Sequence, residues 1–340
     1  MKSVVIRRPG EASVEEMPVP RPGDGEIVVA MKYCGLCGTD MEKIRGEYTA
    51  AMPVLGHEPS GVVSEVGKGV KGLDEGDRVF VHHHVPCGEC HHCRNGSETM
   101  CDRYRTSNID PGGFSEYFRV PGWNVNRGGV LKLPDSVGDE EASLIEPVAC
   151  CMRAIGRCGA REGDVALVVG AGPLGLMHAK LLSLGGVRVL VSDINDRRLG
   201  AARSFGAEET VDAAAAPGAA RRMSEGRGAD IAITASGSPA AILQAIRSVR
   251  KGGRVCLFGV PVKGSRLDYD MSDAFSSELS IFTNYGATER ETVRALSMMA
   301  DGRLRLGPMI SHRFPLTEFG RAVEASASGE AMKVLLHPDR

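Results

Sequence analysis

A glycine-rich turn constrains the fold of this chain more than any other feature of its sequence. It lies between an apolar run at 164–169 and a segment at 174–184 whose apolar residues have helical spacing. Glycines in such a turn permit a sharp bend, a close approach of the backbone to a pyrophosphate, and tight packing of helix on strand. The free N–H groups at the start of the helix then face the phosphates. The turn therefore predicts a dinucleotide-binding unit, with candidate contacts at Gly170, Gly172, Pro173, Leu174 and Gly175.

An acidic residue after the glycine-rich turn indicates which dinucleotide binds. Asp193 ends the next apolar run, at the distance expected for a carboxylate that binds the ribose 2′-hydroxyl. Because a carboxylate there would repel a 2′-phosphate, it favours NAD over NADP. Arg198 is a candidate contact on the adenosine ribose or phosphate side, and together with Arg197 it would relax that selectivity. We therefore predict NAD as the cofactor, with NADP the less favoured alternative.

The pattern of apolar runs changes twice along the chain. Before Pro147, short apolar runs such as 26–31 and 61–67 are bounded by Pro and Gly, which is typical of a β-rich domain. Beyond Pro147, strands alternate with helical stretches, which predicts a parallel sheet with right-handed crossovers. After about Tyr285 the chain ends in a helix and a short strand. A length of 340 residues also favours two domains, and we expect segments at 1–147, 148–285 and 286–340.

Four of the ten cysteines are closely spaced. Without an export signal, such a cluster indicates metal binding rather than disulfides. Four thiolates can complete a tetrahedral site and leave no position for substrate, so they predict a structural zinc that orders a long loop. An iron–sulfur cluster is the weaker alternative. The predicted ligands are Cys87, Cys90, Cys93 and Cys101.

A second set of ligand-type side chains is mixed. Cys37 and His57, with Glu58 or Glu146 as the acidic member, would bind a zinc ion that keeps one position open. Such an ion polarises an alcohol and lowers its pKa, so that an alkoxide forms near neutral pH and hydride can pass to a nicotinamide. Each residue alone is more often a buried thiol, a satisfied histidine or an exposed carboxylate. The metal interpretation rests on their combination with a dinucleotide fold.

Two further residues would support this second site. Asp40 is a candidate acceptor for the other imidazole N–H of His57, which would fix the tautomer of the ring. Thr39 is a candidate hydroxyl relay for the proton of the alcohol.

Composition excludes several functional classes. A formal net charge of -2 argues against a nucleic-acid partner, and the first residues have no apolar core of signal-peptide length, so we expect a cytoplasmic protein. The most apolar region, 165–191, is interrupted by glycines, His178 and Lys180, which argues against a membrane span. A small-molecule alcohol or ketone is the expected partner.

The motifs above occur together in one known family. They are Cys37-Gly38-Thr39-Asp40, Gly56-His57-Glu58, the four cysteines, Glu146-Pro147, and 170–175 followed by Asp193. Over essentially its whole length the chain resembles the zinc-containing medium-chain dehydrogenases, in particular the sorbitol and threonine dehydrogenase branch.

This resemblance implies an α/β fold with two domains. A GroES-like, partly open β-barrel with the zinc sites would comprise 1–147 and the returning segment 286–340, and a doubly wound Rossmann domain would comprise 148–285. It also implies two zinc ions per chain, one catalytic and one structural, and a homodimer or homotetramer. The catalytic ion would be bound by Cys37, His57, and Glu58 or Glu146, with water completing the site.

The chain departs from the family pattern in two places. Some members carry a histidine three positions after the relay residue, where this chain has Glu42, so the end of the proton path is open between Glu42, Lys43, the ribose hydroxyl and water. The run 82–84 consists of three histidines outside the family signature, and we interpret it as structural, with a role near the mouth of the pocket as the minority view. Candidate substrate contacts are Tyr48, Asn284 and Tyr285.

The expected reaction is oxidation of a secondary alcohol, such as a polyol, cyclitol or sugar-like compound, to a ketone. The alternatives are an L-threonine 3-dehydrogenase or a simple secondary alcohol dehydrogenase. More remote alternatives are a zinc-free quinone or enoyl reductase, in which loss of Cys37 or His57 is expected, and a non-catalytic nucleotide-binding protein.

Overall fold

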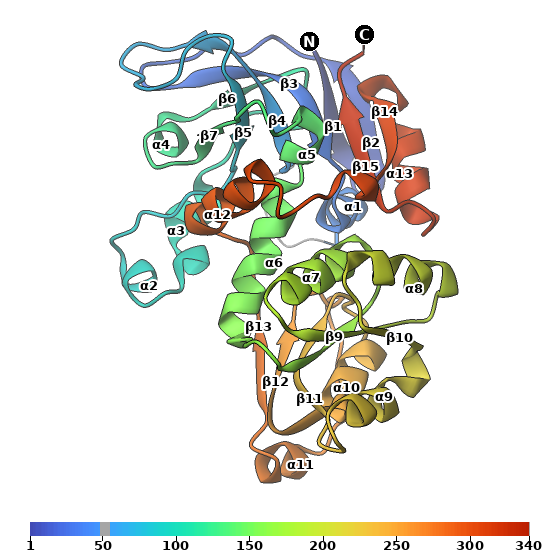
Figure 1. Cartoon of the computed structure of the whole chain (residues 1–340). Helices are drawn as coiled ribbons and strands as arrows, with labels where there is room; N and C mark the ends of the chain where they lie inside the picture. Colours follow the sequence, from blue (N-terminus) through green and yellow to red (C-terminus); the bar gives the residue numbers. More distant parts are fainter. Residues whose placement is uncertain (48–54, 340) are drawn as a thin grey trace. The chain divides into compact units, whose positions relative to one another are not determined.

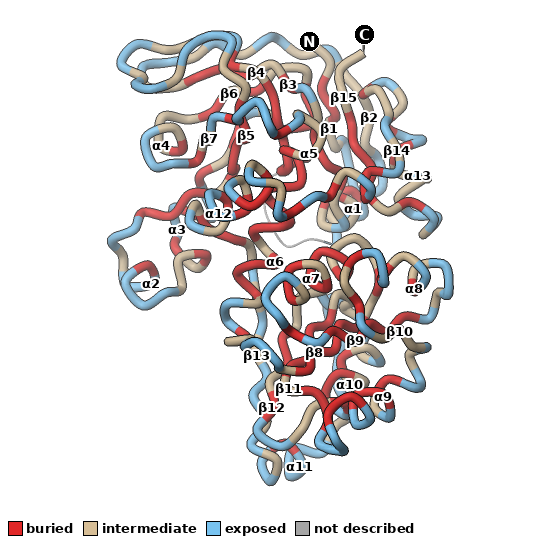
Figure 2. Tube along the Cα trace, viewed as in Figure 1, coloured by how far each residue is buried: buried red, intermediate tan, exposed pale blue. Residues whose placement is uncertain are grey.

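The computed structural model describes residues 1–47 and 55–339 of the 340-residue chain. The chain forms two compact units, Met1–Ala149 with Ala287–Arg340, and Cys150–Gly286 (Figure 1). The first unit thus contains both ends of the sequence. Central strands of both units are largely buried, whereas several edge strands are more exposed (Figure 2). No helix within the described ranges is long and apolar enough to cross a bilayer.

The larger sheet of the first unit joins the two ends of the chain. Its last strand pairs antiparallel with an N-terminal strand, with Leu335 opposite Gly35 and Leu336 opposite Cys34. The sheet order is β14 (Ile310–Pro315), β15 (Lys333–His337), β3 (Ile27–Gly35), β4 (Pro59–Val66), β5 (Arg78–Val81) and β7 (Val130–Lys132), with β6 (Tyr117–Val120) also paired to β3; β1 (Lys2–Arg8) and β2 (Glu11–Glu16) form a separate hairpin.

Alternation along these strands builds the core of the first unit. In β3, Val29 and Met31 are fully or almost fully buried, and they join Val63 of β4, Phe118 of β6 and Leu336 of β15 in one apolar cluster. Burial of such side chains contributes roughly 1.5–3 kcal/mol each. The termini are therefore held together by a shared core as well as by backbone pairing.

The second unit contains a six-stranded parallel sheet, as the alternation of strands and helices predicts. Numbered within this unit, the strand order is 3-2-1-4-5-6, the doubly wound order of dinucleotide-binding folds. The order is β10 (Glu209–Asp212), β9 (Arg188–Asp193), β8 (Val165–Val169), β11 (Ala229–Thr234), β12 (Val249–Leu257) and β13 (Ser280–Thr283). The α/β class with a Rossmann sheet is thereby confirmed.

The connecting helices are mostly short. The first unit contains α1 (Gly38–Arg45), α2 (His91–Arg94), α3 (Asp102–Thr106), α4 (Gly122–Val125), α5 (Asp139–Ala142), α12 (Glu289–Ala300) and α13 (Phe319–Ala327). The second contains α7 (Pro173–Leu184), α8 (Asp196–Ala202), α9 (Ala216–Met223), α10 (Pro239–Ser248) and α11 (Met271–Ser276). The 3-10 turns are η1 (Glu98–Met100), η2 (Arg203–Phe205), η3 (Ala213–Ala215), η4 (Gly307–Met309) and η5 (Leu316–Glu318).

One helix, α6 (Ile145–Cys158), runs from the first unit into the second. The change of pattern at Pro147 therefore lies inside a helix and not in a linker. Proline is tolerated here because it occupies the first turn, where backbone N–H groups have no partner within the helix.

Candidate active site and metal centres

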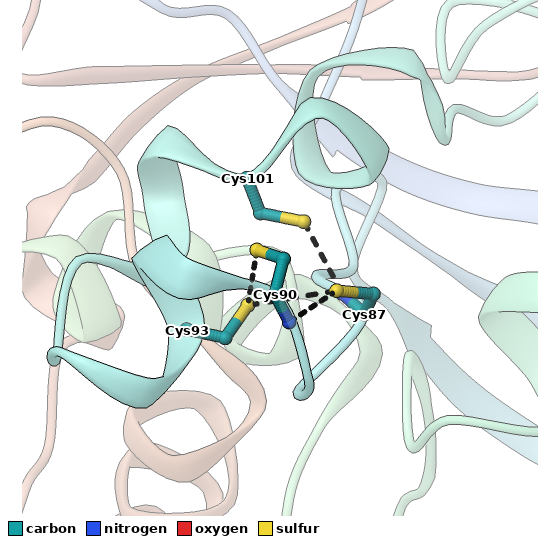
Figure 3. A group of neighbouring side chains, drawn as sticks. All are labelled: Cys87, Cys90, Cys93 and Cys101. Atoms are coloured by element: carbon teal, nitrogen blue, oxygen red, sulfur yellow. Dashed lines mark hydrogen bonds between the residues drawn. The ribbon is translucent and has the colours of Figure 1, made fainter.

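The four clustered cysteines converge at the base of one loop. Their ligand atoms all lie within 4.8 Å of one another, and Figure 3 shows the sulfur atoms gathered between the loop segments. The Sγ–Sγ distances are 3.5 Å between Cys90 and Cys93 and 3.9 Å between Cys87 and Cys93. Thiolates about 2.3 Å from a zinc ion form a tetrahedron with edges of about 3.8 Å. This group of cysteines therefore fits a structural zinc.

Local backbone geometry prepares these sulfurs to bind a cation. Cys90 precedes α2, which carries Cys93, and Cys101 precedes α3. The backbone N–H groups of Glu89 and Cys90 donate to Cys87 Sγ, which lowers the pKa of that thiol to about 6. A thiolate is the form that binds zinc. All ten cysteines are free of disulfides.

The mixed set of ligands lies at the ends of two neighbouring strands. Cys37 follows β3 and precedes α1, and His57 and Glu58 directly precede β4. The ligand atoms of these three residues lie within 4.8 Å of one another. Gly35 makes room for the group, because a Cβ atom at this position would lie 1.8 Å from Glu58 Oε2.

Asp40 contacts two members of this group, His57 and Cys37, from the buried side. It is fully buried, and its Oδ1 lies 3.3 Å from His57 Nδ1 while its Oδ2 accepts a hydrogen bond of 3.0 Å from the Cys37 N–H. Burial alone would raise the pKa of Asp40, but the charge and hydrogen bond of His57 hold that pKa below its usual range. With Nδ1 facing Asp40, His57 directs Nε2 toward the ligand group. Thr39 Oγ1 lies 3.4 Å from this Nε2.

Glu58 is paired with a lysine that the sequence analysis missed. Lys333, on β15, is 5% exposed, forms an ion pair with Glu58 Oε2, and donates to the Leu36 carbonyl at 3.2 Å. The other oxygen of this carboxylate, Glu58 Oε1, has no hydrogen-bond partner among the described residues. Burial raises the pKa of Glu58, and Lys333 offsets that increase only in part. The sequence signal that could have indicated this lysine is its position as the one charged residue at the start of an otherwise apolar strand, β15.

Glu146 lies close enough to influence this pair. It is buried in the first turn of α6, and its negative charge acts on both Glu58 and Lys333. It is not in the group of three ligands whose atoms lie within 4.8 Å. A buried carboxylate beside a thiol and an imidazole has the donor chemistry of an open zinc site.

The three histidines at 82–84 link the two metal-ligand groups. His83 packs against His57, with ring centres 5.3 Å apart, and His84 packs against Tyr104 at 5.0 Å. Tyr104 belongs to the apolar cluster that includes Cys87, Cys93 and Cys101.

The remaining candidate residues have separate surroundings. Asn284 Oδ1 accepts a hydrogen bond from Arg153, and its Nδ2 donates to the carbonyls of Cys150 and Gly286. Tyr285 is 37% exposed. Glu42, half-buried on α1, has its pKa raised by burial and by Glu47. Tyr48 lies outside the described residues.

The glycine-rich turn connects β8 to α7. Gly170 has a φ of +105°, and a Cβ atom on Gly175 would lie 1.8 Å from the Gly170 carbonyl oxygen. Glycine is therefore required at both positions. α7 begins at Pro173, and Leu174 follows in its first turn.

Asp193 connects this turn to the next strand. Its Oδ2 accepts a hydrogen bond of 2.6 Å from the Ala171 N–H, and its Oδ1 accepts one of 2.9 Å from the Asn195 N–H. Asn195 then caps α8 by accepting from the N–H groups of Arg197 and Arg198. The carboxylate therefore supports the turn, and Arg198 lies half-buried in the adjoining helix.

Comparison with known proteins identifies the family. Residues 23–135 match the protein-family model of the alcohol dehydrogenase GroES-like domain, and residues 173–301 match the family model of the zinc-binding dehydrogenases. A sorbitol dehydrogenase of Halalkalibacterium halodurans is 32% identical over 339 residues, covering 97% of this chain and 96% of that protein. An L-threonine 3-dehydrogenase of Legionella pneumophila is 32% identical over 351 residues, covering 99% and 100%.

A solved structure agrees in fold. A zinc-binding dehydrogenase of Sinorhizobium meliloti 1021, described as putative and bound to NADP, superposes with a TM-score of 0.89 at 29% identity and covers 99% of each chain. These matches extend over both units and include the segments that carry the cysteine cluster, the mixed ligand set and the glycine-rich turn. The chain belongs to the family of zinc-binding alcohol dehydrogenases with a GroES-like domain.

Proposed function

We propose that this protein oxidises a secondary alcohol, such as a polyol, cyclitol or sugar-like compound, to a ketone with NAD as the hydride acceptor. The observation that carries the proposal is the group of Cys37, His57 and Glu58, whose ligand atoms lie within 4.8 Å of one another. A zinc ion in this group would polarise the alcohol and lower its pKa, and the bound nicotinamide would accept the hydride.

The residues of the chain have separate roles in this proposal. Cys37 and His57 would hold the ion, with Glu58 or Glu146 as the acidic ligand. Asp40 fixes the imidazole of His57 through the contact at 3.3 Å. The Thr39 hydroxyl would accept the proton of the alcohol and pass it onward, and its distance of 3.4 Å from His57 Nε2 supports this role.

The same proposal assigns functions to the two units and to the cysteine cluster. The first unit would carry a catalytic and a structural zinc ion, giving two per chain, and the second would bind the dinucleotide. Asp193 supports NAD over NADP, since its carboxylate lies at the glycine-rich turn, where a 2′-phosphate would be repelled. We also propose a homodimer or homotetramer, which light scattering on the purified protein would test.

Initial rates of NADH formation test the reaction. The substrates are polyols, cyclitols, L-threonine and simple secondary alcohols, each assayed with and without a zinc chelator on protein of measured zinc content. Turnover of polyols that the chelator abolishes would support the proposal. Turnover that survives complete removal of zinc would contradict it.

L-threonine 3-dehydrogenase activity is the second candidate. It is favoured by the relative from Legionella pneumophila, which carries that name and matches the chain at the same identity as the sorbitol dehydrogenase. Preference for L-threonine over polyols in the same assay would select it.

A further inference from the structure

The middle member of the histidine run lies beside the proposed catalytic site. The rings of His83 and His57 have centres 5.3 Å apart and planes tilted by 54°. His57 faces Asp40 with Nδ1, so its Nε2 side belongs to the ligand group. His83 is thus in direct contact with a ring that would bind the metal, although it is not a ligand in this group.

The surrounding residues hold the His83 ring in place. The ring of His84 packs against it with centres 3.9 Å apart, and His82 packs edge-on at 5.7 Å. The Asn124 amide donates to the His83 carbonyl at 2.9 Å and to the His82 carbonyl at 3.2 Å. His84 Nδ1 lies 2.8 Å from the Ser107 carbonyl. The position of the ring is therefore fixed by the protein alone.

One polar atom of this ring has no partner. His83 is only 8% exposed, and its Nδ1 makes no hydrogen bond within the described part of the chain. The flanking histidines use their Nδ1 atoms, His84 with Ser107 and His82 with Glu289 at 3.2 Å. A buried nitrogen without a partner is unfavourable, so such atoms are usually satisfied by a ligand or water.

We propose that His83 hydrogen-bonds a second polar group of the substrate, on the carbon next to the one oxidised, and so selects vicinal diols over simple secondary alcohols. This inference rests on the proposed function and specifies its substrate class. A neutral imidazole nitrogen donates or accepts according to its tautomer, so it can bind a hydroxyl. The alkyl group of a monoalcohol would leave Nδ1 buried and unpaired, which disfavours that substrate.

Matched substrates and variants test this role. 2,3-Butanediol and 2-butanol differ by one hydroxyl, next to the reacting carbon. The protein is compared with His83→Phe, which keeps a ring and loses the polar atoms. His83→Asn keeps a polar atom at the Nδ1 position, and His83→Gln keeps one at the Nε2 position. We expect His83→Phe to lower kcat/KM for the diol about tenfold and to raise that for 2-butanol, because the unpaired nitrogen that disfavours the monoalcohol is gone. His83→Asn should recover most of the loss, and His83→Gln should not.

Several outcomes would overturn the proposal. An equal loss for both substrates, with zinc content and circular dichroism unchanged, would make His83 a structural residue. Equal rates of diol oxidation in His83→Asn and His83→Gln would also contradict a role for Nδ1. This comparison does not depend on His83→Phe and can be made even if that variant fails to fold. If the unmodified protein oxidises neither alcohol, the proposed function fails separately. In that case, NMR would measure binding of the two alcohols to the zinc-loaded protein with NADH. Tighter binding of the diol that His83→Phe abolishes would support the role of His83. Equal binding of the two alcohols would refute it.

Discussion

Lys333→Met should destabilise the metal-free protein in a way that depends on pH. Lys333 is the only charged partner that the described structure pairs directly with Glu58, and both side chains are almost completely buried. Methionine keeps much of the volume of the lysine stem and removes the charge. Glu58 is then left as a buried carboxyl without an ion-pair partner, with only the charge interaction of His57 to oppose burial and the negative charge of Glu146.

The magnitude follows from the two ways in which Glu58 can respond. Leaving one partner of a buried ion pair uncompensated costs about 3–5 kcal/mol. Glu58 can avoid that cost by taking up a proton, because its pKa in the folded protein will rise further above the ordinary value of 4.5. Keeping it protonated costs about 1.4 kcal/mol for each pH unit above 4.5. The loss is therefore expected to be below about 1 kcal/mol at pH 5 and about 3–5 kcal/mol at pH 8.

The sign of this dependence is fixed by proton binding. Between the unfolded and folded pKa values of Glu58 the folded state binds more protons, so the free energy of unfolding falls as pH rises. Urea or thermal unfolding of chelator-treated protein at pH 5–8, followed by circular dichroism, would measure it. The double variant Lys333→Met/Glu58→Gln is the control and should lose the added pH dependence. A loss that is the same at all pH values, or that persists unchanged in the double variant, would refute the reasoning.

Four other substitutions test separate parts of the proposal. Cys37→Ser should abolish turnover, because it removes a ligand of the catalytic ion, while NADH fluorescence titration still shows cofactor binding. Asp40→Asn should weaken zinc affinity by about 10–100-fold through loss of the His57 contact, as measured by competition with a chelator. Asp193→Ala should weaken NAD binding and narrow the preference over NADP; unchanged kinetics with both cofactors would contradict its role. Cys101→Ser should lower zinc content by about one ion per chain and make the cysteine-bearing loop susceptible to protease. A loop that stays resistant to protease would contradict this prediction.

Local sequence patterns were sufficient to predict the second unit. Its strands form a parallel sheet, as the alternation of strands and helices predicts, and the glycine-rich turn lies where β8 meets α7. The helix at Glu289–Ala300 and the last strand at Lys333–His337 were also expected close to these positions. Apolar periodicity and glycine placement carry this information because they reflect contacts between residues near one another in the chain.

Contacts between distant parts of the sequence could not be predicted. Lys333 reaches Glu58 because β15 pairs with β3, and no local pattern encodes a pairing over such a separation. The contact of His83 with His57 likewise depends on β5 lying beside β4. The continuity of α6 through Pro147 was missed because proline usually ends a helix pattern, except in a first turn.

If His83 binds substrate as proposed, the histidine run would give the cysteine-bearing lobe, residues 87–101, a function beyond local stability. It occupies the three residues between β5, which pairs with the strand that follows His57 and Glu58, and the segment leading to Cys87. Ser107 follows the cysteine cluster in sequence and contacts this segment. Its carbonyl lies 2.8 Å from His84 Nδ1, and its hydroxyl accepts a hydrogen bond from the Val85 N–H and donates one to the Val85 carbonyl. A metal ion that orders this segment would therefore also fix His84, whose ring packs against His83, which in turn contacts His57. The proposed structural site would then take no part in the chemistry, but it would determine how rigidly the proposed substrate contact is held.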